Sequence, residues 1–288
     1  MAAESEVPAS FRSSAVRPGP AALVWGGFQE FVSRRRLIRY LVQADLKKKG
    51  ADTLLGNVWW IVDPLLQMLV YVVLVSVIFQ RSQPDYALFV FAAILPWKWF
   101  TSSIGDGTAA VVSMERLIKQ INFPKIVLPV ASVFAGVANF FFGLIPLAGL
   151  MILFYPHRIS IWLLAIPAIA LVQLLVTLPL AIVLAALNVF YRDVGNLSRH
   201  LLRLWFYLSP AIYGVELIHN VAAKVPIAGK LMELNPWAVL FTAYHDAIYE
   251  TRSPNWLLLA LLAAASIPLL AIAIFIFKRV EPSFAKVL

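Results

Sequence analysis

Six long apolar segments dominate this chain of 288 residues and determine the solvent in which it folds. A helix needs about 20 mostly apolar residues to cross the hydrocarbon core of a bilayer. These runs do not alternate as barrel strands do, and the chain is 61% hydrophobic and only 14% charged, against about 25% in soluble domains. We therefore predict an all-α integral membrane protein with six transmembrane helices. The predicted spans lie near 58–79, 88–112, 126–154, 161–190, 201–213 and 256–277.

The distribution of lysine and arginine predicts the topology. If the segment before the first span is cytoplasmic, 18 of the 24 lysines and arginines lie on the cytoplasmic side. Five lie on the outer side, and Lys98 lies inside a span. Cytoplasmic loops are enriched in these residues, so both termini are predicted to be cytoplasmic.

The segment before the first span has two parts. Residues 1–22 are polar and rich in Pro, Ser and Ala, lack the apolar run of a signal peptide, and are predicted to be a disordered cytoplasmic tail. Residues 23–57 are predicted to be an interfacial amphipathic segment, because Leu37, Tyr40 and Leu41 recur at helical spacing. A solvated basic helix is the competing interpretation. The candidate contacts to an anionic lipid headgroup are Arg34, Arg35, Arg36 and Arg39.

A short amphipathic helix is predicted in the cytoplasmic loop after the second span, over about 114–123. Ser113 is a candidate cap, Pro124 ends the helix, and an apolar stripe recurs every three to four residues. Two interpretations stay open: the helix docks into a groove on a soluble partner, or it rests on the membrane surface. Its residues are Met114, Glu115, Arg116, Leu117, Ile118, Lys119, Gln120 and Ile121.

The outer segment at about 214–250 is long and interrupted by polar residues. Asn235 and Pro236 are typical of a helix start, which predicts a helix over 237–249. That helix is too short to span, so we expect short helices that dip into the outer leaflet under a cover of protein.

Aromatic and charged side chains inside the spans are candidates for a transport path. Aromatic residues cluster beside Pro96 and Pro210, and aromatic rings stack on the apolar faces of sugars. Packing is the competing interpretation for each ring. The candidates for a glycan path are Trp97, Trp99, Phe100, Tyr207 and Tyr213. The intramembrane charges Lys98, Asp63 and Asp106 raise the question of what they face.

The sequence predicts no catalytic residue, metal site or cofactor in this chain. There is no cysteine, no phosphate-binding loop of the G-x-x-x-x-G-K-[ST] type, and no metal-ligand spacing among the four histidines.

The chain resembles the permease subunit of bacterial ABC exporters for polysaccharides, the class that exports O-antigen and teichoic acid. The resemblance covers residues 30–288 in order. It is carried by the stretches at 55–60 (LGNVWW), 63–71 (DPLLQMLVY), 95–97 (LPW), 117–129 (LIKQINFPKIVLP), 190–195 (FYRDVG), 207–213 (YLSPAIY) and 234–236 (LNP). Lys98 and Asp63 depart from the small polar residue and the asparagine that the family pattern implies at those positions.

The resemblance implies a six-span permease domain over 58–288 that moves a lipid-linked polysaccharide from the cytoplasm across the bacterial inner membrane, as in lipopolysaccharide biosynthesis. It implies a homodimer with two separate ATPase subunits, which bind the ATP and Mg²⁺. It makes the helix at 114–123 the coupling helix and the segment at 214–250 the outer gate. Two alternatives stay open: a permease for another lipid or drug, and a membrane-embedded lipid-linked sugar transferase.

Overall fold

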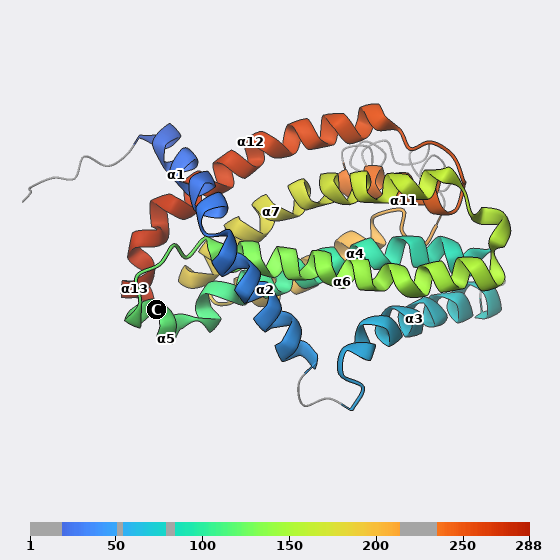
Figure 1. Ribbon diagram of the computed structural model, residues 1–288, viewed down its shortest axis with the longest axis horizontal. Coiled ribbons are helices and arrows are strands. Elements are labelled where there is room, and N and C mark those ends of the chain that lie inside the picture. Colours follow the sequence, from blue (N-terminus) through green and yellow to red (C-terminus); the bar gives the residue numbers. More distant parts are fainter. Residues whose placement is uncertain (1–18, 51–53, 79–83, 214–234) are drawn as a thin grey trace, which may run out of the picture.

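The computed structural model describes residues 19–50, 54–78, 84–213 and 235–288 and shows a bundle of long helices running in nearly the same direction (Figure 1). Within these residues the regular secondary structure consists of helices, without a strand. Five helical segments are long and apolar enough to span a membrane, which confirms the all-α membrane fold. They are Trp59–Ile78, Tyr86–Ser113, Val127–Phe154, Ile161–Phe190 and Trp256–Val287.

Two helices precede the bundle. Helix α1 (Pro20–Ser33) begins at a proline, and α2 (Arg35–Gly50) follows after one residue. Helix α1 packs on the last long helix and α2 packs on α6. The predicted interfacial segment is therefore two helices, and residues 20–22 belong to the first of them rather than to a tail. Most of the predicted tail lies outside the described residues.

The first span lies at the edge of the bundle. A turn of 3₁₀-helix (η1, Gly56–Val58) leads into α3 (Trp59–Val72), which continues as a stretch of π-helix (η2, Val73–Ile78). Many of its apolar side chains are exposed in the single chain, as expected for a helix whose neighbour is lipid.

Helix α4 (Tyr86–Ser113) forms the centre of the bundle and contacts α3, α6, α7, α8 and α11. Its 28 residues correspond to about 42 Å of helix, more than the hydrocarbon core requires. Helix α6 (Val127–Phe154) packs tightly against it. A Cβ at Gly136 would lie 2.2 Å from the Ser103 Oγ and one at Gly143 would lie 2.8 Å from a Leu95 methyl carbon, so small residues permit the close approach.

The chain then returns through the fourth span. Two 3₁₀ turns (η3, Pro156–Arg158; η4, Ile161–Ala165) lead into α7 (Ile166–Phe190). At this end of the bundle, Asp85 accepts hydrogen bonds from His157 Nε2 and Arg158 Nε, both at 2.9 Å. Burial would raise the pKa of the Asp85 carboxyl, but these two partners outweigh it and hold that pKa below its ordinary value.

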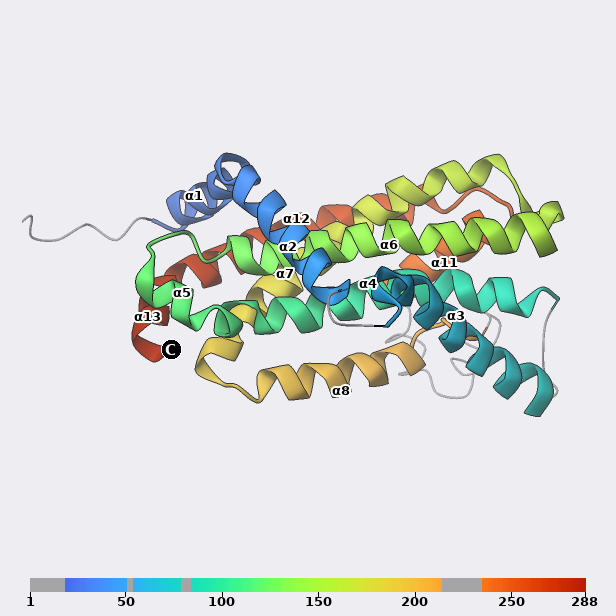
Figure 2. The same cartoon turned by 60° about the horizontal axis from the view of Figure 1, so that its bottom comes forward.

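The predicted fifth span differs from the structure. Helix α8 (Val194–Tyr207) has 14 residues, and the chain continues to Tyr213 as turns containing Pro210. That helix is too short to count as a span on its own, so the predicted number of six is not established by the described residues. Figure 2 shows α8 below the central α4, with most of α3 also below it.

The segment predicted to lie on the outer side contains the helix that the sequence predicts. Residues 214–234 lie outside the described residues, but α11 (Pro236–Ile248) starts where Asn235 and Pro236 indicate. The Asn235 Oδ1 accepts from the Trp237 N–H at 3.0 Å and from the Trp205 Nε1–H at 2.9 Å. Nine residues of α11 are buried among α4, α7, α12 and η4, so this helix is covered by protein.

The last span is α12 (Trp256–Val280), followed by η5 (Glu281–Ser283) and α13 (Phe284–Val287). The chain ends beside α5 (Glu115–Gln120) at the same end of the bundle as α1 (Figure 1). We call this the α5 end.

Candidate functional site

The loop helix after α4 is shorter than the sequence predicts. Helix α5 covers six residues, because Ile121 is already extended. The prediction that Ser113 caps it is wrong, since the Ser113 hydroxyl donates to the Ala110 carbonyl at 3.1 Å and Met114 occupies the cap position. The last turn of α4 thus uses the hydroxyl that the cap would have needed.

The apolar residues of α5 and its flanks have different surroundings. Ile118 is 5% exposed and belongs to the core, whereas Met114 and Ile121, which flank the helix, are 38% and 54% exposed. Glu115 pairs with Lys119 at 2.7 Å, and that hydrogen bond lowers the pKa of the Glu115 carboxyl. The predicted apolar stripe is therefore divided along its length: Ile118 anchors the helix, and Met114 and Ile121 at its two ends are open. The polar residues Arg116, Lys119 and Gln120 are also exposed, and Leu117 is half-buried.

A network of charges fixes this loop to the rest of the α5 end. The Glu281 carboxylate accepts from the Lys125 backbone N–H at 2.6 Å and pairs with Lys278 at 2.6 Å. Lys278 also pairs with Glu30 of α1 at 2.8 Å. The network joins α1, α12 and the start of α6, and sequence reasoning missed it because its bonded partners lie up to 248 residues apart.

The basic residues of α2 lie on the surface at the α5 end. Arg34, Arg35, Arg36 and Arg39 are exposed, while Ile38 is buried against the bundle. On α1, Trp25 and Phe28 are 60% and 47% exposed. Exposed rings beside exposed arginines suit a pair of helices in the headgroup region. The assignment of the arginines to a lipid headgroup stays a prediction.

Lys49, near the end of α2, joins this helix to α4. Its ammonium pairs with Asp106 at 2.6 Å and with Asp45 at 2.9 Å. Burial would lower the pKa of Lys49, but the two carboxylates outweigh it and raise that pKa above its ordinary value. One of the three intramembrane charges noted in the sequence, Asp106, thus binds α2 to α4.

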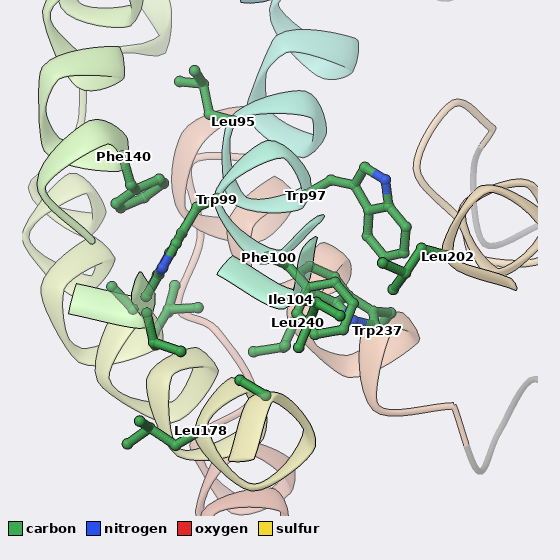
Figure 3. Packing of buried hydrophobic residues seen from close by; sticks show 14 of the residues in the cluster. Leu95, Trp97, Trp99, Phe100, Ile104, Phe140, Leu178, Leu202, Trp237 and Leu240 are labelled. Atoms are coloured by element: carbon green, nitrogen blue, oxygen red, sulfur yellow. The ribbon is translucent and has the colours of Figure 1, made fainter. Parts of the chain in front are cut away.

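The aromatic candidates fall into two groups. Trp97, Trp99 and Phe100 are 6%, 2% and 0% exposed. Figure 3 shows Trp97 and Phe100 near Trp237, and Trp99 near Phe140. In this conformation the rings of Trp97 and Phe100 pack against protein, whereas Trp99 also borders a pocket beside Lys98.

The other two aromatic candidates are more accessible. Tyr207 is 51% exposed, and Tyr213 donates from its hydroxyl to the Tyr207 carbonyl at 3.1 Å. A role of the five residues in guiding a glycan stays a prediction, and Tyr207 is its exposed member.

The other two intramembrane charges form a pair. The Lys98 ammonium of α4 is ion-paired with the Asp63 carboxylate of α3. Sequence reasoning gave Asp63 no partner, because the two residues lie 35 positions apart on different spans. They are also the two residues that depart from the family pattern, so the departures compensate each other.

Helix α8 carries an exposed surface that sequence reasoning did not single out. One exposed ridge is apolar and consists of Leu197, Leu201, Leu204 and Leu208. The adjacent exposed stripe is polar and consists of Asn196, Arg199, His200, Arg203 and Tyr207. The sequence feature that could have predicted this surface is the alternation of leucine with arginine at helical spacing.

Comparisons with known proteins give one family. No family model matches the chain. The O-antigen export system permease protein RfbA of Myxococcus xanthus is 35% identical over 258 residues, which cover 90% of this chain and 97% of that protein. Two proteins of the same name from Klebsiella pneumoniae are 25% and 26% identical over 88% of this chain and 95% of their own lengths. With this identity along nearly all of both chains, and with the helical membrane fold described above, the chain belongs to the family of O-antigen export permeases.

Proposed function

We propose that this chain is the membrane subunit of an ATP-driven exporter that moves a lipid-linked polysaccharide across the inner membrane. The observation that carries the proposal is the 35% identity with a protein named as an O-antigen export permease, over 90% of the chain. The cargo is a cell-envelope glycan of the O-antigen or teichoic-acid kind. ATP and Mg²⁺ are held by a separate partner chain, and this chain is a permease and not an enzyme.

The α5 end supports a docked ATPase. A partner that drives the permease needs a rigid contact, and α5 is anchored by Ile118 while Met114 and Ile121 stay open. The network around Glu281 connects the same loop to α1 and α12. Force applied to α5 would therefore reach the bundle and the interfacial helices together.

The surface of α8 supports a second copy of the chain. Arginines on a helix within a membrane bundle are costly against lipid, so they face water or another protein. A leucine ridge beside them provides packing. A homodimer with α8 near its axis would use the ridge for contact and the polar stripe for a hydrated path, with two ATPase subunits at the α5 ends.

The charge asymmetry supports the location. The 18 lysines and arginines assigned to the inner side include those of α2 and of the α5 end. Both termini then lie in the cytoplasm, and η3 and Asn255 lie on the outer side.

Deletion and reconstitution test the proposal. Cells that lack the gene should make the glycan but keep it inside, and the wild-type gene should restore it to the surface. The purified chain should bring down an ATPase, and the complex in vesicles should move lipid-linked glycan only with ATP. Glycan that is never synthesised in the deletion strain would instead indicate the sugar transferase.

A further inference from the structure

The pair formed by Lys98 and Asp63 lies within the membrane-spanning segments. Lys98 is 12 positions from Tyr86, the first residue of α4, or about 18 Å along the helix axis. Asp63 is four positions from Trp59, the first residue of its 20-residue span, or about 6 Å, so the pair lies nearer to the end of the membrane region where α3 begins. It is also accessible in the single chain, with the side chain of Asp63 59% exposed and that of Lys98 32% exposed.

Contact with lipid is energetically unfavourable for such an ion pair. A charged side chain within the hydrocarbon core is costly, and charged residues in spans therefore face water or protein. Pairing reduces this cost but leaves the second carboxylate oxygen and two ammonium protons without the partner that water would supply. The exposed side of Asp63 thus points to a hydrated space in the membrane domain.

A pocket of about 80 Å³ lies beside Lys98, between α3, α4 and α6. A water molecule needs about 10–15 Å³ by this measure, so several fit. The walls combine polar and aromatic side chains, and Asn139 Oδ1 has no hydrogen-bond partner within the described part of the chain. The residues used below are Trp60, Lys98, Ser102, Asn139 and Phe140.

The chemistry of the walls selects a class of ligand. Lys98 and Asp63 neutralise each other, so the pocket has no net charge with which to hold an ion. It does offer ammonium protons, a hydroxyl and a carboxamide, which exchange hydrogen bonds with neutral polar groups. Trp60 and Phe140 add apolar faces. The pocket thus has a few polar groups, aromatic walls and no net charge. These properties suit a neutral sugar ring that carries hydroxyl or acetamido groups.

We propose that the pocket bounded by Lys98 (the partner of Asp63), Ser102 and Asn139 is a hydrated subsite that binds neutral sugar residues of the glycan during its passage. The proposal rests on the proposed function for the identity of its ligand. It places the polar contacts of the glycan on α4 and α6, apart from the buried rings of Trp97 and Phe100. The competing explanation is a structural ion pair beside a dry gap.

The absence of cysteine from the chain allows a direct test of hydration. Ser102→Cys and Asn139→Cys place single thiols in the pocket, and Ile145→Cys places a matched thiol on the 59% exposed apolar face of α6. The probe is a charged methanethiosulfonate, which reacts in water and does not enter lipid. Both pocket thiols in the purified complex should react at least about tenfold faster than the control thiol. Equal rates would mean a dry pocket and would overturn the proposal.

Protection by cargo tests the ligand class. The reaction is repeated in membranes of cells that make the lipid-linked glycan and of cells blocked in its synthesis, with the ATPase held without ATP. The Ser102→Cys thiol should be protected only where glycan is present. If the wild-type complex exports glycan and this thiol reacts equally in both membranes, the subsite is wrong and the proposed function stands. If the wild-type complex exports no glycan, the proposed function itself fails.

Discussion

At the residue scale, side-chain amides replace the water that the membrane interior lacks. The Gln173 Nε2–H donates to the Pro96 carbonyl at 2.9 Å, and the Gln173 Oε1 accepts from the Tyr244 hydroxyl at 2.9 Å. Asn188 joins the Thr108 carbonyl to the Gly195 N–H in the same manner. Each amide uses both of its ends, so helices interrupted by prolines or turns stay connected without solvent.

The contributions of Lys98 and Asp63 to the free energy of unfolding should be coupled. Asp63→Asn or Lys98→Ser alone leaves a charge without its partner, which costs several kcal/mol when fully buried. Because Asp63 is more than half exposed, we expect about 1–3 kcal/mol for each single change. The double change should recover most of the loss, measured as thermal unfolding of the purified complex. A double variant as unstable as the two single losses combined would show that the residues are not coupled.

Glycine at 136 should be required for the packing of α4 on α6. Gly136→Ala places a methyl group 2.2 Å from the Ser103 Oγ and 2.6 Å from Trp99 Cδ1, so the helices must separate. We expect a loss of about 1–3 kcal/mol, typical of overpacked cores. Gly105→Ala on α4 is the matched control, because nothing lies within 4 Å of its added carbon. Equal thermal unfolding of the two variants would contradict the close packing.

At the element scale, substitutions at the buried and the exposed positions of α5 and its flanks should separate folding from coupling. Ile118→Asp puts a charge in the core and should abolish stable protein. Arg116→Glu combined with Ile121→Asp changes only exposed positions and should leave the membrane subunit folded. The second variant should lose ATPase co-purification and glycan export, scored by pull-down and by surface glycan. Normal binding and export by it would remove α5 from the docking surface.

The sequence anticipated the elements better than their contacts. Apolar length placed four spans and the start of the last one to within a few residues, and Asn235–Pro236 located the start of α11, because both signals are local. The Ser113 cap failed because its hydroxyl bonds within the preceding helix. The partner of Asp63 and the core positions of Trp97 and Phe100 depend on how distant helices meet, which periodicity in one segment does not report.

At the scale of the whole molecule, the α5 end should face the cytoplasm. Lys286→Cys lies at this end and Ser253→Cys lies before α12 at the other, and both positions are exposed. In intact spheroplasts an impermeant maleimide should label the thiol at 253, and the thiol at 286 should be labelled only after lysis. Labelling of both thiols in intact spheroplasts would refute the predicted topology.

The leucine ridge of α8 should lie close to its copy in a dimer. A two-fold axis brings each residue near the axis opposite itself, so a single cysteine there can form a disulfide with its equivalent. Leu201→Cys and Leu204→Cys test the middle of the ridge, where the native side chains are 54% and 59% exposed. Mild oxidation in membranes should give a covalent dimer for at least one of them.

The control for this cross-link lies across the bundle. Leu269 of α12 is equally exposed, at 56%, and α12 lies on the opposite side from α8 (Figure 2). Leu269→Cys should stay monomeric under the same oxidation. Because the polar stripe lies next to the ridge, a cross-link through α8 would also place Arg199 and Arg203 beside the axis, where two copies can enclose a hydrated path. Cross-linking through Leu269 and not through α8 would place the dimer contact on α12 and expose the arginines of α8 to lipid, which their charge disfavours.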